Sequence, residues 1–182
     1  MDIGSAQRDM ARSYVGGAPG VFVSGAVWLV AGLVERSHGI RSAFIALFLG
    51  GMLIFPASVV ISRVLFKAGK AFDGNPLERL ASESTAILFA GILTGYALLQ
   101  VAPAMVFSAV AVAIGARYFI FRSVYGEPVY WVLGGALALA AAIGMLHPTM
   151  LPVGVALLVG AIECAFSVIL FLRWKKHRDP ST

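Results

Sequence analysis

Six long stretches of this sequence consist almost entirely of apolar and small residues, and this pattern restricts the fold more than any other feature. Each is near the length of about 20 residues that a helix needs to cross the roughly 30 Å hydrocarbon core of a bilayer. We therefore predict an all-α fold, a polytopic bundle of six transmembrane helices. The predicted spans are Gly16–Val34, Ala43–Phe66, Ser84–Val101, Ala104–Phe121, Val129–Leu146 and Val153–Leu172.

Composition agrees with a membrane protein made of one transmembrane domain, residues 1–182. Hydrophobic residues make up 59% of the chain and charged residues only 13%, whereas soluble domains carry about 25% charged residues. The mean hydropathy is +0.88, and no long polar segment separates two halves.

Basic residues predict the orientation. With six spans, all but two of the 14 Lys and Arg residues lie on the side of the termini, and the exceptions are Arg36 and Arg41. The positive-inside rule then places both termini in the cytoplasm of a bacterial-type cell, with the chain in the inner (plasma) membrane. We expect the net charge of +5 to contact lipid head groups. No nucleic acid partner is expected, because no basic stripe alternates with exposed aromatic residues.

The connections also carry signals. Met1–Ser13 is polar, and the apolar stretch after it is too long for a cleavable signal, so we expect it to remain. In the longest connection, Asn75 can cap a helix that starts at Pro76, which predicts a short interfacial helix over Pro76–Glu83. We expect a short outer loop over Glu35–Ser42 that closes the first hairpin. We also expect an aromatic belt at the cytoplasmic interface, from Tyr14, Tyr118, Tyr125, Tyr130, Trp131 and Trp174.

Small residues recur four apart in three of the spans, which lets helices approach closely in lipid. Packing within one chain is the favoured interpretation; contact with a second copy or another membrane protein is the alternative. The residues are Gly16, Gly20 and Ser24, then Gly91 and Gly95, then Gly134, Ala138 and Ala142.

Glu163 is the main candidate for a functional residue, because a carboxyl in the middle of a span is costly. It shares a helix stripe with Ala156, Gly160 and Ser167, so it should face the bundle interior. Two interpretations are open. A neutral Glu163 forms a hydrogen bond that packs helices together, or it contacts a ligand or carries a proton in a transport pathway.

Other polar residues are predicted at a similar depth. Ser24, Thr94 and Tyr96 are candidate walls of a site around Glu163, and Ser167 is a further candidate to bind the ligand or proton. Arg117 is the nearest cation, and its long stem makes it a possible charge partner. Without a cation, we expect Glu163 to be protonated.

The outer mouth of the bundle holds a second polar group, formed by Glu35, His38, Gln100 and His147. Two histidines and a carboxylate are a possible three-ligand metal set, but the spacing gives no paired ligands, and we expect solvated loop residues. No phosphate-binding loop, metalloprotease motif, nucleophile elbow or Cys-x-x-Cys motif occurs. We therefore predict no catalytic residue, no metal and no cofactor.

Arg36–Ser42 leading into Ala43–Ala57, together with Asn75-Pro76-Leu77, resembles small bacterial membrane proteins grouped as a domain of unknown function. The resemblance implies an integral membrane fold and no particular activity.

The length and the six-helix layout are also similar to the substrate-capturing subunits of energy-coupling-factor vitamin transporters. Those subunits dock a partner through small residues at four-residue spacing on their first helix, and Gly16, Gly20 and Ser24 have that spacing. No ligand-binding motif of a vitamin family is visible, so this similarity concerns the fold alone.

The leading functional hypothesis is therefore a membrane protein that binds or transports a small molecule or lipid at Glu163. The second is a structural or regulatory membrane partner without its own ligand. The third is a membrane enzyme at the outer face that uses Glu35, His38 and His147. A polar cavity that reaches Glu163 would favour the first hypothesis over the second.

Overall fold

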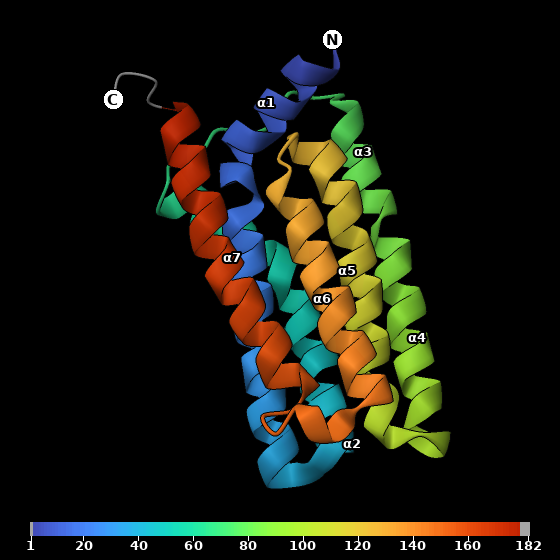
Figure 1. Ribbon diagram of the computed structural model, residues 1–182. Helices are drawn as coiled ribbons and strands as arrows, with labels where there is room; N and C mark the ends of the chain where they lie inside the picture. The colour runs from blue at the N-terminus through green and yellow to red at the C-terminus, as the bar shows by residue number, and fades with distance from the viewer. Residues whose placement is uncertain (1, 179–182) are drawn as a thin grey trace.

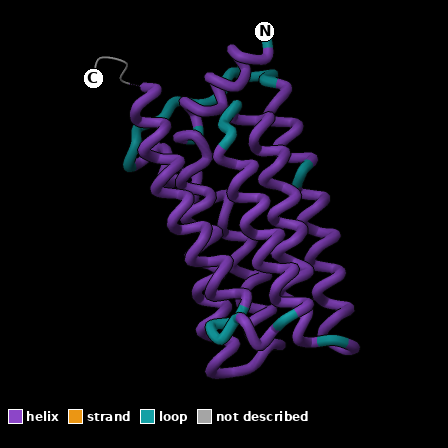
Figure 2. The backbone as a smooth tube through the Cα atoms, viewed as in Figure 1, coloured by secondary structure: helices purple, strands orange, loops and turns teal. Residues whose placement is uncertain are grey.

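The computed structural model describes residues 2–178 as a bundle of helices without a strand in that range (Figures 1 and 2). In Figure 1, α1 lies across the end of the bundle that also holds the end of α7, and we call this the α1 end. The opposite end is called the far end. The helices are α1 (Ile3–Ser13), α2 (Ala18–Val64), α3 (Pro76–Glu83), α4 (Thr85–Val101), α5 (Val106–Tyr125), α6 (Val129–Leu146) and α7 (Val155–Arg178), with 3-10 turns at Val15–Gly17, Pro103–Met105 and Pro148–Met150.

Among residues 2–178, five helices are long and apolar enough to cross a membrane, and the first is a hairpin. Gly39 of α2 has φ 80° and ψ 171°, which interrupts the helix. The arms before and after it run antiparallel, since a Cβ on Gly50 would lie 2.6 Å from Cγ1 of Val27. The expected loop over Glu35–Ser42 is not observed, because helix continues up to Gly39 from both sides and the chain reverses at that residue. The prediction of an all-α membrane bundle is confirmed.

Close backbone contacts hold the first arm of α2 against α7. A Cβ on Gly160 would lie 2.8 Å from both the carbonyl oxygen of Gly25 and the nitrogen of Leu29, closer than real Cβ contacts allow. Similarly, a Cβ on Gly134 in α6 would lie 2.7 Å from the carbonyl oxygen of Gly115 in α5. Such glycines allow dense packing where lipid provides no hydrophobic drive between helices. In this chain they contact helices of the same chain.

The polar N-terminal segment forms a helix that the sequence analysis did not anticipate. Asp2 caps α1 by accepting from the backbone N–H of Ser5, and Ala6 and Met10 are buried one turn apart. The side chain of Gln7 donates to the carbonyl oxygen of Ser123 at 2.8 Å, which fixes α1 to the end of α5. The Asp2 cap and the four-residue spacing of apolar residues are the signals that predict this helix.

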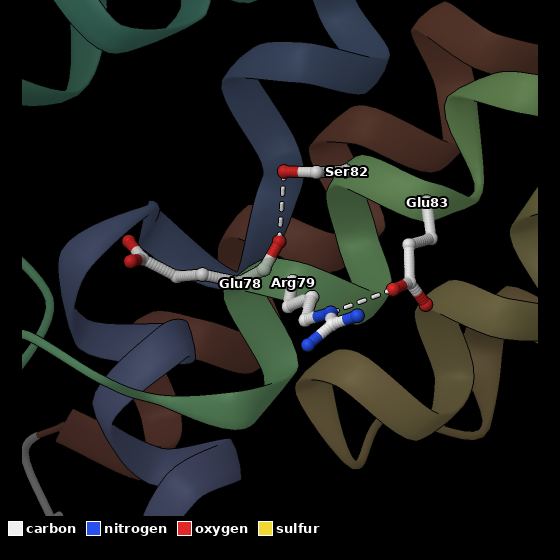
Figure 3. A network of polar contacts seen from close by, with 4 residues as sticks. All are labelled: Glu78, Arg79, Ser82 and Glu83. Carbon is white, nitrogen blue, oxygen red and sulfur yellow. Dashed lines mark hydrogen bonds and ion pairs between the residues drawn. The ribbon is translucent and has the colours of Figure 1, made fainter.

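The helix α3 starts where its capping signal lies. Asn75 accepts from the backbone N–H of Leu77, and the first turn starts with a proline. Within α3, Arg79 pairs with Glu83 at 2.8 Å, and the hydroxyl of Ser82 donates to the carbonyl oxygen of Glu78 (Figure 3). These exposed contacts contribute little, because solvent screens surface ion pairs.

Tyr14 joins the start of the bundle to α3. Its hydroxyl donates to Oε1 of Glu78 at 2.9 Å. Burial and this carboxylate raise the pKa of Tyr14 to about 12, so the hydroxyl stays a donor at physiological pH.

Substitution of Gly39 tests the hairpin. Gly39→Ala should lower stability by about 1–3 kcal/mol, because only glycine adopts this backbone region without strain. Gly51→Ala in the same helix has open space around its Cβ and should be neutral or stabilising. Melting curves in detergent measure both, and equal effects would contradict the assigned geometry at Gly39.

Substitution of Gly160 tests the close contact of α2 with α7. Gly160→Val should destabilise the protein by about 1–3 kcal/mol, since the backbone of α2 must move. Gly135→Val introduces the same side chain where nothing lies within 4 Å. Intrinsic tryptophan fluorescence during heating compares the two variants, and the contact is refuted if Gly135→Val is the more harmful change.

Candidate functional site

The carboxyl of Glu163 is completely enclosed by protein, with 0% of the residue exposed. It faces the bundle interior, as its stripe of small residues predicts. The hydroxyl of Tyr118 in α5 donates to its Oε1 at 2.6 Å. This hydrogen bond joins α5 to α7 in a buried site of low dielectric, where hydrogen bonds are stronger than in water.

The second carboxyl oxygen has a different environment. Oε2 of Glu163 is buried and has no hydrogen-bond partner. Ser24, from the first arm of α2, is buried, and its hydroxyl lies next to the Glu163 carboxyl and the Tyr118 hydroxyl, where it can act as a donor to the carboxyl after a small shift. A buried polar atom without a partner costs about 1–3 kcal/mol and requires an explanation.

Aromatic stacking holds Tyr118 in place and continues toward the α1 end. The ring of Tyr118 stacks on Tyr130 of α6 with centroids 5.9 Å apart, and Tyr130 stacks on Tyr125 at 5.5 Å. Phe121 packs edge-on against Tyr118, Tyr125 and Tyr130. We call Tyr118, Tyr125 and Tyr130 the tyrosine column.

The expected aromatic belt is wrong for two of its members. Tyr118 is 4% exposed and Tyr130 is 0% exposed, so both are core residues. Trp131 does lie at the surface, under the guanidinium of Arg122 at 4.9 Å from the ring centroid. Helix periodicity predicts the burial of Tyr118, because this residue shares a helix face with the small residues Ala111 and Gly115.

A turn of three residues with positive φ binds Tyr130, the middle residue of the tyrosine column. Val15, Gly16 and Gly17 have φ values of 54°, 62° and 80°. The turn presents the carbonyl oxygen of Gly16 to the hydroxyl of Tyr130, which donates to it at 2.7 Å. A Cβ on Gly17 would overlap the Tyr130 hydroxyl, so both backbone conformation and space require glycine.

A cavity of about 70 Å³ opens beside this turn, at the α1 end. Glu163 is not among the residues that line this cavity, although α7 carries Glu163 and also provides some of the lining residues. The lining residues are Ala11, Gly16, Tyr125, Glu127, Leu170, Trp174 and His177.

Arg117 and Ser167 occupy positions near the site without contacting its carboxyl. The Nε of Arg117 donates to Oγ of Ser84 at 3.1 Å, and its guanidinium lies 4.8 Å from the Phe121 ring centroid. These contacts direct Arg117 toward the start of α4. Ser167 is buried, and its hydroxyl donates to the carbonyl oxygen of Cys164 at 2.7 Å.

The structure does not bring Thr94 and Tyr96 to Glu163. Both lie on the exposed face of α4, where Tyr96 is 62% exposed. The hydroxyl of Thr94 donates to the carbonyl oxygen of Ala90 within its own helix. A similar depth along the bundle does not predict contact with Glu163, because depth does not determine whether a residue lies on the inner or the outer face of its helix.

At the far end, the polar residues do not converge. His38 pairs with Ser37 through Nδ1 at 2.7 Å, and Gln100 accepts from Arg41 at 3.4 Å. His147 is exposed and Glu35 is half-buried. In residues 2–178, no three His, Cys, Asp or Glu side chains are grouped so that they could hold a metal ion.

Residues 3–173 match a family of unknown function, DUF7010. The chain belongs to this family. The match covers both the tyrosine column and Glu163, so the site is part of the family domain. No curated protein and no solved structure matches the chain, and a similarity to energy-coupling-factor subunits is not shown.

Removal of the Tyr118 hydroxyl tests the central hydrogen bond. Tyr118→Phe should cost about 1–2 kcal/mol, and a double-mutant cycle with Glu163→Gln should show a coupling of about 0.5–2 kcal/mol. Tyr96→Phe removes an exposed hydroxyl and should leave the melting temperature unchanged. Additive effects of Tyr118→Phe and Glu163→Gln would show that the pair is not energetically coupled.

Proposed function

We propose that this chain is a membrane protein with an intramembrane proton-binding site at Glu163, which serves the binding or transport of a small molecule or lipid. One observation carries the proposal. The carboxyl is wholly buried, Oε1 is bonded to Tyr118, and Oε2 has no partner.

A proton is the ligand that fits this environment. An isolated carboxylate in a low-dielectric interior is very costly, and a proton on Oε2 removes that charge. Tyr118 of α5 is the titratable group that contacts the carboxyl, and Cys164, the next residue of α7, directs its sulfur at Gly25 of α2. The nearest arginine, Arg117, is directed to Ser84 and Phe121. Neutralisation by a proton therefore requires no cavity large enough for an organic ligand.

The proposed orientation has six crossings, with the α1 end in the cytoplasm of a bacterial inner membrane. Arg36 and Arg41 flank the turn at Gly39 at the far end, whereas the other basic residues belong to the α1-end half of the bundle. This asymmetry supports the orientation by the positive-inside rule. Lipid head groups are the natural partners of the exposed cations.

A structural or regulatory membrane partner is the second candidate. Two observations favour it. The described cavity does not reach Glu163. In addition, Gly25 and Gly160 bring the backbones of α2 and α7 into contact one turn from the carboxyl. On this alternative, the Tyr118–Glu163 hydrogen bond only fastens helices together, and the carboxyl never exchanges its proton.

Infrared spectroscopy of the protein in lipid nanodiscs separates these candidates. A proton-binding Glu163 should give a C=O stretching band of a buried protonated carboxyl, whose intensity changes reversibly with pH. Glu163→Gln should abolish this band, and Glu35→Gln at the far end should retain it. A band at Glu163 that does not respond to pH while the protein stays folded would support the structural role instead.

A further inference from the structure

We propose that the cavity at the α1 end is a water-filled site through which Glu163 exchanges its proton, with Tyr130 and Leu170 closing the path between them. This inference rests on the proposed proton-binding function and adds the route and its side of the membrane.

The cavity is suitable for water and protons. Its volume of about 70 Å³ exceeds the roughly 10–15 Å³ that one water requires, and polar groups line it. Glu127 and His177 provide titratable side chains at this site, and Tyr125 adds a hydroxyl. Glu127 is paired with Arg173 at 2.7 Å, which fixes its carboxylate beside the cavity.

The cavity and Glu163 lie on one face of α7. Positions 163, 167, 170 and 174 are spaced by four, three and four residues, which places them in a single stripe. Leu170 and Trp174 line the cavity, and Leu170 is seven residues from Glu163. At about 1.5 Å per residue, the carboxyl is therefore about 10 Å beyond the cavity along the helix axis.

Several polar atoms lie in the region of about 10 Å between the cavity and Glu163, although side chains fill this region in the structure. The Tyr130 hydroxyl is bonded to Gly16, which itself lines the cavity. The Ser167 hydroxyl lies one turn from Glu163 on the same stripe, and the Tyr118 hydroxyl contacts the carboxyl. Tyr130, Ser167 and Leu170 are all buried, so exchange requires transient local opening.

In the opposite direction α7 is closed by backbone contacts, and the buried polar atoms there, Nε1 of Trp28 and the hydroxyl of Ser108, belong to α2 and α5. On the far-end side of Glu163, Gly160 contacts the backbone of Gly25, and Leu157 packs against Gly32. A Cβ on Gly32 would lie 3.0 Å from the backbone nitrogen of Leu157, which shows how closely the helices approach. Ala156, seven residues from Glu163 on this side, is 0% exposed. We therefore assign access to the α1 end, where the cavity lies on the same stripe of α7 as Glu163.

Cysteine accessibility tests the route in the full-length protein in membrane vesicles. Cys164 is the only cysteine, so Cys164→Ser gives a background without thiols. In it, Leu170→Cys should react with a charged, membrane-impermeant thiol reagent at least about tenfold faster than Ala156→Cys, because local opening exposes only the α1-end side. Reaction should require reagent on the α1-end side.

Two controls define the outcome of this measurement. Ala156→Cys is the matched position, equally distant from Glu163 in the other direction. Ile169→Cys is an exposed apolar position of the same helix and should stay unreactive in lipid. A folded Leu170→Cys variant that is unreactive, or that reacts no faster than Ala156→Cys, overturns the route.

A second measurement follows the carboxyl itself. After transfer into D2O, Leu170→Ala should accelerate the isotope shift of the Glu163 infrared band by about tenfold, because loss of packed atoms lowers the free energy of opening. Leu172→Ala changes an exposed side chain and should leave the rate unchanged. If the wild-type band never responds to pH, the proposed function fails. If it responds but Leu170→Ala exchanges at the wild-type rate, only the route fails.

Discussion

The hydrogen bond between Tyr118 and Glu163 is the interaction on which the centre of this bundle depends. It joins α5 to α7 in the core, where Glu163 is 0% exposed and Tyr118 is only 4% exposed. A carboxyl without water must find its partners within the protein, and here one oxygen does so and the other does not. The stack of Tyr118 on Tyr130 keeps the hydroxyl aimed at the carboxyl. The positive-φ turn at Gly16 in turn anchors Tyr130.

The two ends of the bundle differ in a way that follows from this arrangement. Toward the α1 end, hydroxyl groups, a backbone carbonyl oxygen and a cavity succeed one another from Glu163 outward. Toward the far end, glycines bring α2 and α7 into backbone contact. Close packing excludes water, whereas a hydroxyl group can both donate and accept a hydrogen bond and can therefore belong to a path for a proton. The asymmetry thus arises from which residue types occupy the two halves of the same helix stripe.

Sequence reasoning succeeded where a local pattern has one physical solution. Apolar stretches of membrane-spanning length can only be helices, and the stripe of Ala156, Gly160 and Ser167 correctly turned Glu163 inward. It failed for Thr94 and Tyr96, which share the expected depth but lie on the outer face of α4. Sequence reasoning also failed for α1. This segment is mostly polar, but it forms a capped helix whose apolar residues pack against the bundle.

Sequence alone determined that this is an all-helical membrane bundle and that Glu163 faces its interior, because hydrophobic length and helix periodicity are local properties. Only the tertiary structure decided that Tyr118 is the partner of Glu163, that Arg117 is engaged elsewhere, and that the cavity lies at the α1 end. These features depend on the rotation of each helix about its axis. That rotation is set by contacts such as Gly25 with Gly160 and Gly115 with Gly134, between residues far apart in the chain.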